Sequence, residues 1–347
     1  MPSTPTRTAR PAVRPARDAF WDMVKALLIF LVILGHSVQF ILYPADKGMA
    51  LVFADSLFKG IYLFHMPCFI AISGYFAAAS LRKKGHAALL PTLRRLLLPT
   101  CAAALLIIIT RYYQGRLTWP HTLHDASTFL WFLTVAAECI LCYHLMMWQK
   151  HLAYRILILL LAPLMALYIS NSPQLYHMWP SATQFTYLWP FFIMGAYLSN
   201  RGFTHQHITR KWSLFLPLFL VAYIFFEPHW SIYTAPLRFN LHSLIIHIIR
   251  SAAAIVACGA FLWLAHLLSP LSKYPIVSRI GQSTLALYVL QTYAFIILRH
   301  MQLHEQAASM GHAVAIITAL LLLFGLYYAY RISRKIPGVA QFFYGEQ

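Results

Sequence analysis

The sequence predicts an all-α, polytopic membrane protein with about ten transmembrane helices and both termini in the cytoplasm. Two features of its composition predict this class: 60% of the 347 residues are hydrophobic and only 10% are charged, against about 25% charged residues in soluble domains. The mean hydropathy is +0.63, so the fold must bury apolar surface against lipid. This composition excludes a secreted disulfide scaffold, a disordered regulator and a water-soluble nucleic-acid binder.

Runs of about 20 mostly apolar residues, enough to cross a bilayer core of about 30 Å, define the expected spans. Ten such runs are bounded by charged residues, proline or asparagine: 22–42, 58–81, 93–110, 127–148, 153–169, 185–198, 212–226, 241–268, 283–298 and 313–332. The sixth and seventh runs are short enough to be tilted or partly re-entrant. The eighth, which contains Arg250, is long enough to tilt strongly.

Lys and Arg residues predict the orientation, because cytoplasmic loops hold the excess of positive charge. With the N-terminus inside, nineteen Lys and Arg residues fall in cytoplasmic segments and six on the opposite side. The net charge of +18 is therefore interpreted as a topology signal, with no nucleic-acid partner. Residues 1–20 are predicted to form a disordered basic cytoplasmic tail, residues 21–335 the transmembrane domain, and residues 336–347 a short cytoplasmic tail.

Ionisable side chains inside apolar spans are costly unless they face a cavity or a partner, so each is a functional candidate. Lys25 and His36 are eleven residues apart, about three helical turns at about 100° per residue, which places them on one helix face. At a rise of about 1.5 Å per residue they are separated by about 16 Å. Lys25 is thus expected near the cytoplasmic mouth and His36 in the outer half of the bilayer. His65, near the outer end of the second span, is expected to share a cavity with His36.

Other polar groups within the spans are weaker candidates. Ser73 and Tyr75 flank Gly74, which permits close helix approach while the neighbours supply hydroxyls. Glu138 is the only acid in the middle of a span, where it can pair with a basic group or orient a histidine. Cys139 and Cys142 form a CxxC pair, but no second pair or nearby histidine completes a metal set, so no metal site is predicted.

The cytoplasmic side carries a cationic rim that can hold a polyphosphate or a nucleotide. It is formed by Arg82, Lys83, Lys84, Arg94 and Arg95. The alternative is a positive-inside bias or contact with anionic lipids. Aromatic residues concentrate in the opposite loops, as in a membrane-interface belt. Flat rings also suit the apolar faces of sugars, so a carbohydrate site remains open.

Several short elements follow one another in the order found in a known family. They are Trp21 to Lys25, Leu34 to Ser37, Phe64 to Tyr75, Arg95 to Pro99, Trp131 to Leu133, Pro190 to Gly195 and Ile280 to Tyr288. The most specific are Lys25 and His36, with ten residues between them, and the pairing of an FHMP element with an SGY element. In these elements, which are distributed along nearly the whole chain, the sequence resembles acyltransferase family three, the integral-membrane O-acyltransferases, and within it the fucose 4-O-acetylase-like branch.

The resemblance implies a ten-helix bundle that moves an acyl group, most often acetyl, from cytoplasmic acyl-CoA to a hydroxyl of an extracytoplasmic glycan. It carries over His36 as the catalytic histidine, Lys25 as its motif partner, and Arg95 as part of a basic motif before the third span. The chain departs from the family at Thr92, where a second basic residue is common, and at Gln291, where a histidine is common.

The expected mechanism uses acetyl-CoA, or another acyl-CoA, as a co-substrate and no permanently bound cofactor. His36 takes the proton of the acceptor hydroxyl as it attacks the thioester, with an acetyl-histidine intermediate as the alternative. Donors to the oxyanion are expected among Ser73, Tyr75 and His65. The charged end of the donor is expected to bind Lys83, Lys84, Arg94 and Arg95.

Membrane lipids and a polysaccharide or lipid-linked sugar acceptor are the remaining expected partners, and the bacterial cytoplasmic (inner) membrane is the expected location. The rival hypothesis is a transporter or flippase of a glycan or lipid-linked sugar, in which the same polar groups bind a ligand without chemistry. No inverted repeat is visible in the sequence, which weakens that hypothesis. The face shared by Lys25 and His36, with the cationic rim at one end, favours a CoA donor.

Overall fold

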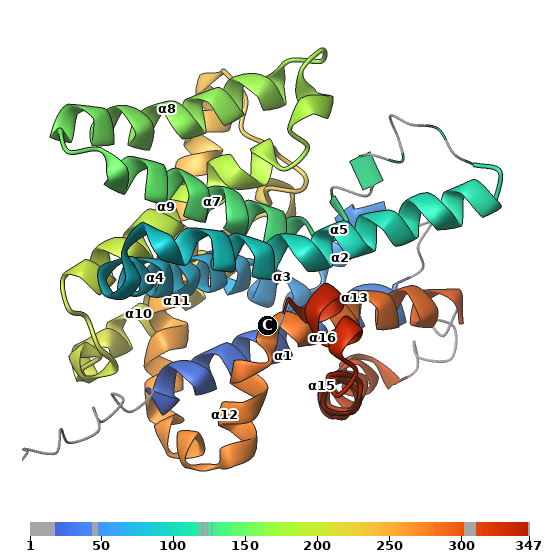
Figure 1. Ribbon diagram of the computed structural model, residues 1–347. Coiled ribbons are helices and arrows are strands. Elements are labelled where there is room, and N and C mark those ends of the chain that lie inside the picture. The colour runs from blue at the N-terminus through green and yellow to red at the C-terminus, as the bar shows by residue number, and fades with distance from the viewer. Residues whose placement is uncertain are drawn as a thin grey trace, which may run out of the picture.

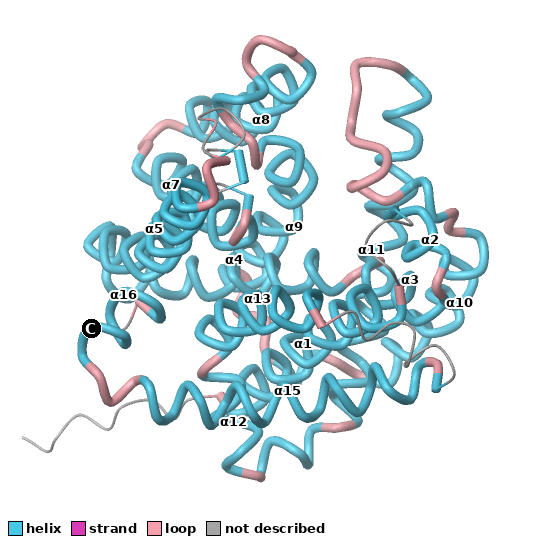
Figure 2. The backbone as a smooth tube through the Cα atoms, turned by 90° about the vertical axis from the view of Figure 1, so that its right-hand side faces the viewer, coloured by secondary structure: helices cyan, strands magenta, loops and turns pink. Residues whose placement is uncertain are grey.

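The computed structural model describes residues 18–43, 48–116, 118, 122, 124–125, 128–301 and 310–345. Residues 1–17 of the predicted tail lie outside these ranges. Within the ranges every regular element is a helix, and the described part of the tube in Figure 2 contains no strand. The all-α prediction is therefore confirmed.

Nine helices have seventeen or more residues: α1 (Ala19–Ser37), α4 (His65–Lys84), α5 (Leu89–Tyr113), α7 (Trp131–Trp148), α8 (Leu152–Asn171), α9 (Ala182–Asn200), α11 (Leu241–Leu267), α13 (Thr284–His300) and α15 (His312–Ser333), among the described residues. The shorter α-helices of the same ranges are α2 (Gly48–Ala54), α3 (Ser56–Tyr62), α10 (Phe215–Phe225), α12 (Pro275–Gln282) and α16 (Pro337–Tyr344). A π-helical turn, Val38–Leu42, extends α1.

Six helical stretches of the described chain are long and apolar enough to cross a membrane: Ala19–Leu42, Ser56–Tyr113, Trp131–Trp148, Leu152–Asn171, Leu241–Leu267 and His312–Ser333. The second stretch runs through α3, α4 and α5. Helices α12 and α13, bent by 73° at their junction, would together make a seventh span. The protein is therefore an integral membrane protein with several spans, whereas the number ten and the cytoplasmic location of both termini stay predictions.

The helices form two groups that face each other. In Figure 1, α4, α5, α7, α8 and α9 pack side by side in the upper half, and α1, α12, α13, α15 and α16 lie in the lower half. Helix α1 contacts α12, α13 and α15 within its own group and α4 across the divide. This arrangement buries α1 on most of its sides, with Met23, Leu28 and Ile33 fully buried. Side chains between the two groups line the cavities described below.

Two glycines bring α4 and α9 into close contact. A Cβ atom at Gly74 would lie 2.0 Å from the carbonyl oxygen of Phe192, and one at Gly195 would lie 1.8 Å from that of Ala71. Only glycine fits at these positions, so the two helix backbones touch, as small residues allow in membrane helices. The close approach expected at Gly74 is therefore present, and it fixes the helix that carries His65 and Ser73.

The segment predicted to be a C-terminal tail contains a packed helix. Helix α16 contacts α5 and α13. Its last residue, Tyr344, is buried, and its hydroxyl lies 2.6 Å from the Ser333 hydroxyl. Gly345 follows with a positive φ of 61° against the backbone of Arg95. The end of the described chain therefore covers the region of α5 that contains Arg95.

Candidate active site

Two adjoining cavities lie between the two groups of helices. The larger, about 320 Å³, is called the Lys25 cavity after the lysine in its wall. Its polar lining residues are Lys25, Ser73, Ser80, Thr92, Arg95, Thr284 and Tyr288. The rest of the wall is apolar and comes from α1, α4, α5, α7 and α13. The cavity thus combines a long apolar wall with two cations.

The second cavity, about 210 Å³, is called the His36 cavity. It is lined by Val32, His36, Gln39, Tyr62, His65, Met66, Trp131, Tyr233 and Tyr288. Two imidazoles and four aromatic rings therefore surround it. The expectation that His36 and His65 share a cavity agrees with this arrangement.

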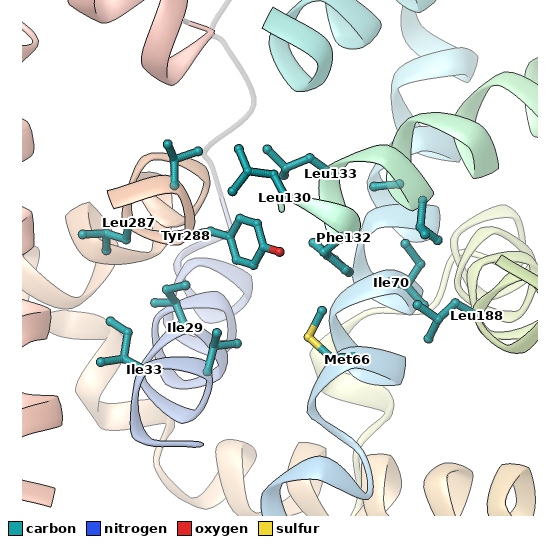
Figure 3. Packing of buried hydrophobic residues seen from close by; sticks show 14 of the residues in the cluster. Ile29, Ile33, Met66, Ile70, Leu130, Phe132, Leu133, Leu188, Leu287 and Tyr288 are labelled. Atoms are coloured by element: carbon teal, nitrogen blue, oxygen red, sulfur yellow. The ribbon is translucent and has the colours of Figure 1, made fainter. Parts of the chain in front are cut away.

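The two cavities meet at three side chains. Val32, Met66 and Tyr288 line both of them. Figure 3 shows Tyr288 of α13, Phe132 of α7 and Met66 of α4 pointing toward one another. A molecule that reaches from the Lys25 cavity to the imidazoles therefore passes these side chains.

One face of α1 connects the cavities. Lys25, Ile29 and Val32 line the Lys25 cavity, and Val32 and His36 line the other. Their spacings of four, three and four residues are those of a single α-helical face. Lys25 and His36 therefore lie on one face of α1, as their spacing in the sequence predicts.

His36 is held in a defined tautomer. Its Nδ1 lies 3.2 Å from Oε1 of Gln39, in the π-helical turn that follows α1. Because this amide oxygen accepts only, Nδ1 carries the proton and Nε2 is left with a lone pair. The rings of Phe40 and Phe295, with centroids 5.7 and 5.6 Å away, flank the imidazole. His36 is thus arranged as a proton acceptor.

His65 has the same arrangement. It is 2% exposed, and its Nδ1 donates to the Ile61 carbonyl at 2.9 Å. The neutral ring therefore also presents an unprotonated Nε2, and Tyr62 stands against it edge-on with ring centroids 4.5 Å apart. A neutral His65 in this tautomer accepts a hydrogen bond, so its expected role as an oxyanion donor requires a protonated ring.

Lys25 has a buried counter-ion that the sequence reasoning did not identify. Its Nζ lies 2.7 Å from Oδ1 of Asp22, whose side chain is 3% exposed. Ser278 and Gln282 of α12 donate to Oδ2 of Asp22 at 3.2 and 3.1 Å. A Cβ at Gly281 would lie 1.8 Å from the Asp22 carbonyl oxygen. The only sequence signal was the i, i+3 spacing of an acid and Lys25 on one helix.

The three predicted oxyanion or cavity residues lie in different places. Ser73 lines the Lys25 cavity and donates to the Phe69 carbonyl at 3.0 Å. Tyr75 donates to the Phe203 carbonyl at 2.7 Å and lines neither cavity. Glu138 accepts from Trp179 and Ser181 at 2.9 and 2.5 Å, and it too is outside both linings. Tyr75 and Glu138 therefore connect chain segments in this structure.

The four predicted donor-binding cations also differ. Arg95 lines the Lys25 cavity. Arg94, Lys83 and Lys84 lie outside both linings, although all four cations are exposed. Thr92, which replaces a basic residue common in the family pattern, lines the Lys25 cavity and donates to the Ala88 carbonyl at 2.7 Å.

Tyr288 was quoted in a sequence element but given no role. Tyr288 is the residue with a hydroxyl group that lines both cavities. Gln291, one turn further along α13, is 1% exposed and lines neither. Within the described residues, no group of three His, Cys, Asp or Glu side chains is placed to hold a metal ion.

Known proteins place the chain in a family. The model of the acyltransferase 3 family, described as an acyltransferase domain, matches residues 18–333. The chain is 42% identical over 94 residues to the nodulation protein NolL of Mesorhizobium japonicum, covering 27% of this chain and 24% of that protein. It is 46% identical over 65 residues to the nodulation protein NolL of Sinorhizobium fredii, covering 19% and 17%.

These alignments span about a quarter or less of the relatives' own length. No solved structure matches the chain. The family model, in contrast, covers all the helices that line the two cavities. The chain therefore belongs to acyltransferase family three.

Proposed function

We propose that the protein moves an acyl group, most simply acetyl, from cytoplasmic acyl-CoA to a glycan hydroxyl on the other side of the bacterial inner membrane. One observation carries the proposal. The Lys25 cavity, with cations in its wall, and the His36 cavity, with two proton-accepting imidazoles, meet at Val32, Met66 and Tyr288. A donor can bind in one cavity and react in the other.

The donor fits the Lys25 cavity by charge and shape. Arg95 and Lys25 can donate charged hydrogen bonds to phosphate oxygens. Such hydrogen bonds are the strongest that proteins make to these anions. The exposed Arg94, Lys83 and Lys84 add long-range attraction to the anion, which salt screens. The pantetheine arm is long and thin, and the apolar wall with Ser73, Ser80 and Thr284 can pair its amides. This arm would bring the thioester to the junction.

The chemistry follows from the imidazole tautomers. As the acceptor oxygen attacks the thioester carbonyl, Nε2 of His36 takes its proton, a new C–O bond forms, and the C–S bond then breaks. The proton returns to the departing CoA sulfur, so His36 ends neutral. His65, with its own Nε2 unprotonated, would accept a hydrogen bond from a second acceptor hydroxyl and orient the sugar.

The carbonyl oxygen gains negative charge during the attack and needs a donor. The Tyr288 hydroxyl is the best placed, because Tyr288 lines both cavities. Ser73 of the Lys25 cavity already donates to the Phe69 carbonyl, so it could serve only after rotation of its hydroxyl. The aromatic walls of the His36 cavity, Tyr62, Trp131 and Tyr233, suit the apolar faces of a sugar in a polysaccharide or a lipid-linked glycan.

A matched pair of arginines on one helix tests the donor site. We expect Arg95→Glu to weaken acyl-CoA binding strongly and Arg94→Glu to weaken it little, because only Arg95 lines the Lys25 cavity. The measurement is binding of radiolabelled acetyl-CoA to the purified protein at two salt concentrations. Equal effects of the two substitutions would show that the donor binds elsewhere.

A glycan transporter or flippase remains the rival function. Purified protein incubated with acetyl-CoA and candidate glycans separates the two, because only an acyltransferase releases free CoA and gives an acylated product. Absence of both CoA binding and acyl transfer, with glycan movement across vesicles, would favour transport.

A further inference from the structure

Besides the two cavities, the structure holds a buried cation inside a membrane helix. Arg250 of α11 is 2% exposed. Its Nη1 donates to the Ala235 carbonyl at 2.5 Å, and its Nη2 lies 2.7 Å from Nδ1 of His247. No acidic side chain pairs with Arg250 among the described residues. An unpaired charge of this kind is costly and marks a functional site by default.

One edge of the guanidinium is left open. Nε of Arg250 is buried and has no hydrogen-bond partner in the described part of the chain. Nη2 carries two N–H groups, and His247 can accept only one of them. Nε and Nη2 form the side of the guanidinium that binds the two oxygens of a carboxylate in parallel. The unused donors are therefore arranged for a carboxylate.

Arg250 lines a small third cavity of about 20 Å³. The polar residues in its wall are Lys59, Tyr62, Tyr187, Ser231 and Arg250. A water molecule needs about 10–15 Å³ measured with a probe of its own size, so the space admits one or two oxygen-sized atoms. It can take the end of a carboxylate but not a whole sugar or a phosphodiester.

Lys59 supplies a second positive charge at this cavity. Its ammonium lies 4.8 Å from the centre of the Tyr223 ring, and it interacts electrostatically with Glu227. Glu227 is itself within 3.1 Å of His229 and does not line the cavity. Glu227 therefore acts on Lys59 from outside the cavity, whose own wall contains Lys59 and Arg250.

The third cavity lies one aromatic ring away from the imidazoles. Tyr62 lines it and also lines the His36 cavity, where its ring centroid is 4.5 Å from that of His65. On the far side, the ring of Tyr187 lies 5.2 Å from the Arg250 guanidinium. Tyr62 is therefore the side chain common to the His36 cavity and the cavity that Arg250 lines.

We propose that Lys59 and Arg250 form an acceptor subsite for a carboxylate, so that the preferred acceptor contains a uronic acid or another carboxylate-bearing sugar. The proposal rests on the proposed acyl transfer to a glycan and specifies its substrate class. The carboxylate enters the third cavity and pairs with Nε and Nη2 of Arg250, while a hydroxyl of the same glycan faces Nε2 of His36.

A matched pair of acceptors tests the subsite. Trigalacturonate and its methyl ester carry the same ring hydroxyls and differ at the carboxyl groups, which the ester makes neutral and enlarges by a methyl group. In acetyl-CoA assays of the purified full-length protein, we expect KM for the free acid to be at least about tenfold below KM for the ester, as for the loss of a bidentate charged contact.

Lys59→Met and Arg250→Lys should each bring the ratio of the two KM values toward one without changing KM for acetyl-CoA. The exposed Arg238 provides the control, because Arg238→Lys should leave the ratio unchanged.

The outcomes separate the subsite from the proposed reaction. Equal KM values for acid and ester in the wild type, or an unchanged ratio in Lys59→Met, would overturn the subsite while leaving acyl transfer intact. Saturation-transfer NMR of trigalacturonate without acetyl-CoA gives an independent readout. Binding that depends on Lys59 and Arg250, without any acetylated product, would support the subsite and overturn the proposed reaction. If Arg250→Lys fails to accumulate in the membrane, the partly exposed Lys59 alone decides.

Discussion

The Lys25 cavity and the His36 cavity share three side chains but hold their polar groups differently. Around Lys25 the ionisable groups are charged and compensated, because Lys25 pairs with Asp22, which also accepts from Ser278 and Gln282. Around His36 they are two imidazoles, each bound through Nδ1 to a residue of its own helical segment. The volumes also differ, about 320 against 210 Å³.

This difference indicates that Lys25 and His36, at two places along α1, have different roles. A fixed positive charge attracts and orients an anionic donor, but it cannot take a proton, whereas a neutral imidazole can. Separating the two along one helix face keeps the charge of Lys25 away from the base. Val32, Met66 and Tyr288, which line both cavities, stand where a molecule would pass from the first cavity to the second.

The largest effect is expected from removing the base. His36→Ala should lower acyl transfer by about 100- to 10,000-fold, the usual contribution of a general base, while donor binding in the Lys25 cavity stays near normal. The measurement is CoA release together with equilibrium binding of acetyl-CoA. The exposed His242 serves as the control in His242→Ala. Retention of more than half the activity in His36→Ala would remove His36 from the chemistry.

The fold class was predictable because composition and long apolar runs are properties of single segments. The shared face of Lys25 and His36 was predictable for the same reason, since both lie on one helix. The partners of Asp22 were not, because Ser278 and Gln282 are more than 250 residues away and depend on how α12 packs on α1. Arg94 and Arg95 are adjacent in sequence, and only the packing of α5 shows which one faces the cavity.

The second largest effect concerns the charged pair of the Lys25 cavity. Asp22→Asn should destabilise the protein by about 3–5 kcal/mol, because it leaves one member of a mostly buried pair uncompensated. Lys25→Met should also reduce stability and raise KM for acetyl-CoA, without changing KM for the acceptor.

The double variant Asp22→Asn with Lys25→Met separates stability from donor binding. It should regain part of the stability, because no unpaired charge remains, but not the donor affinity. Thermal unfolding in detergent and donor titrations measure the two quantities. Full recovery of donor affinity in the double variant would show that Lys25 only neutralises Asp22.

A smaller change is expected at the junction. Met66→Ala should raise the activity with butyryl-CoA relative to acetyl-CoA, because it widens the passage between the cavities. Deleting a buried Met side chain also costs about 2–5 kcal/mol, so a matched control is needed. Met23 is fully buried and lines neither cavity, so Met23→Ala should lose stability without changing the preference for acyl length. The same shift in both variants would contradict a gating role for Met66.

The smallest effect is expected at the end of the molecule near the His36 cavity, where Asp55 joins three segments. Its carboxylate accepts from the Phe58 amide at 2.9 Å and the Tyr43 hydroxyl at 2.8 Å, and it lies 2.7 Å from Nε2 of His312. Burial alone would raise the pKa of Asp55, but these hydrogen bonds hold the pKa below its ordinary value. Asp55 therefore stabilises the fold above the unfolded pKa of about 3.9, and this contribution is lost as the pH falls through the lower folded value.

Asp55→Asn should accordingly lower the melting temperature near neutral pH, as expected for a charged hydrogen bond that contributes about 1.5–3 kcal/mol. The difference from the wild type should shrink below about pH 4, where the wild-type carboxyl also becomes neutral. Because Asp55 caps α3, which carries Tyr62 of the His36 cavity, KM for the acceptor should rise while KM for the donor stays constant. A melting-temperature difference that is independent of pH would show that the charge of Asp55 does not stabilise the fold. A change confined to KM for the donor would show that Asp55 does not support the His36 cavity.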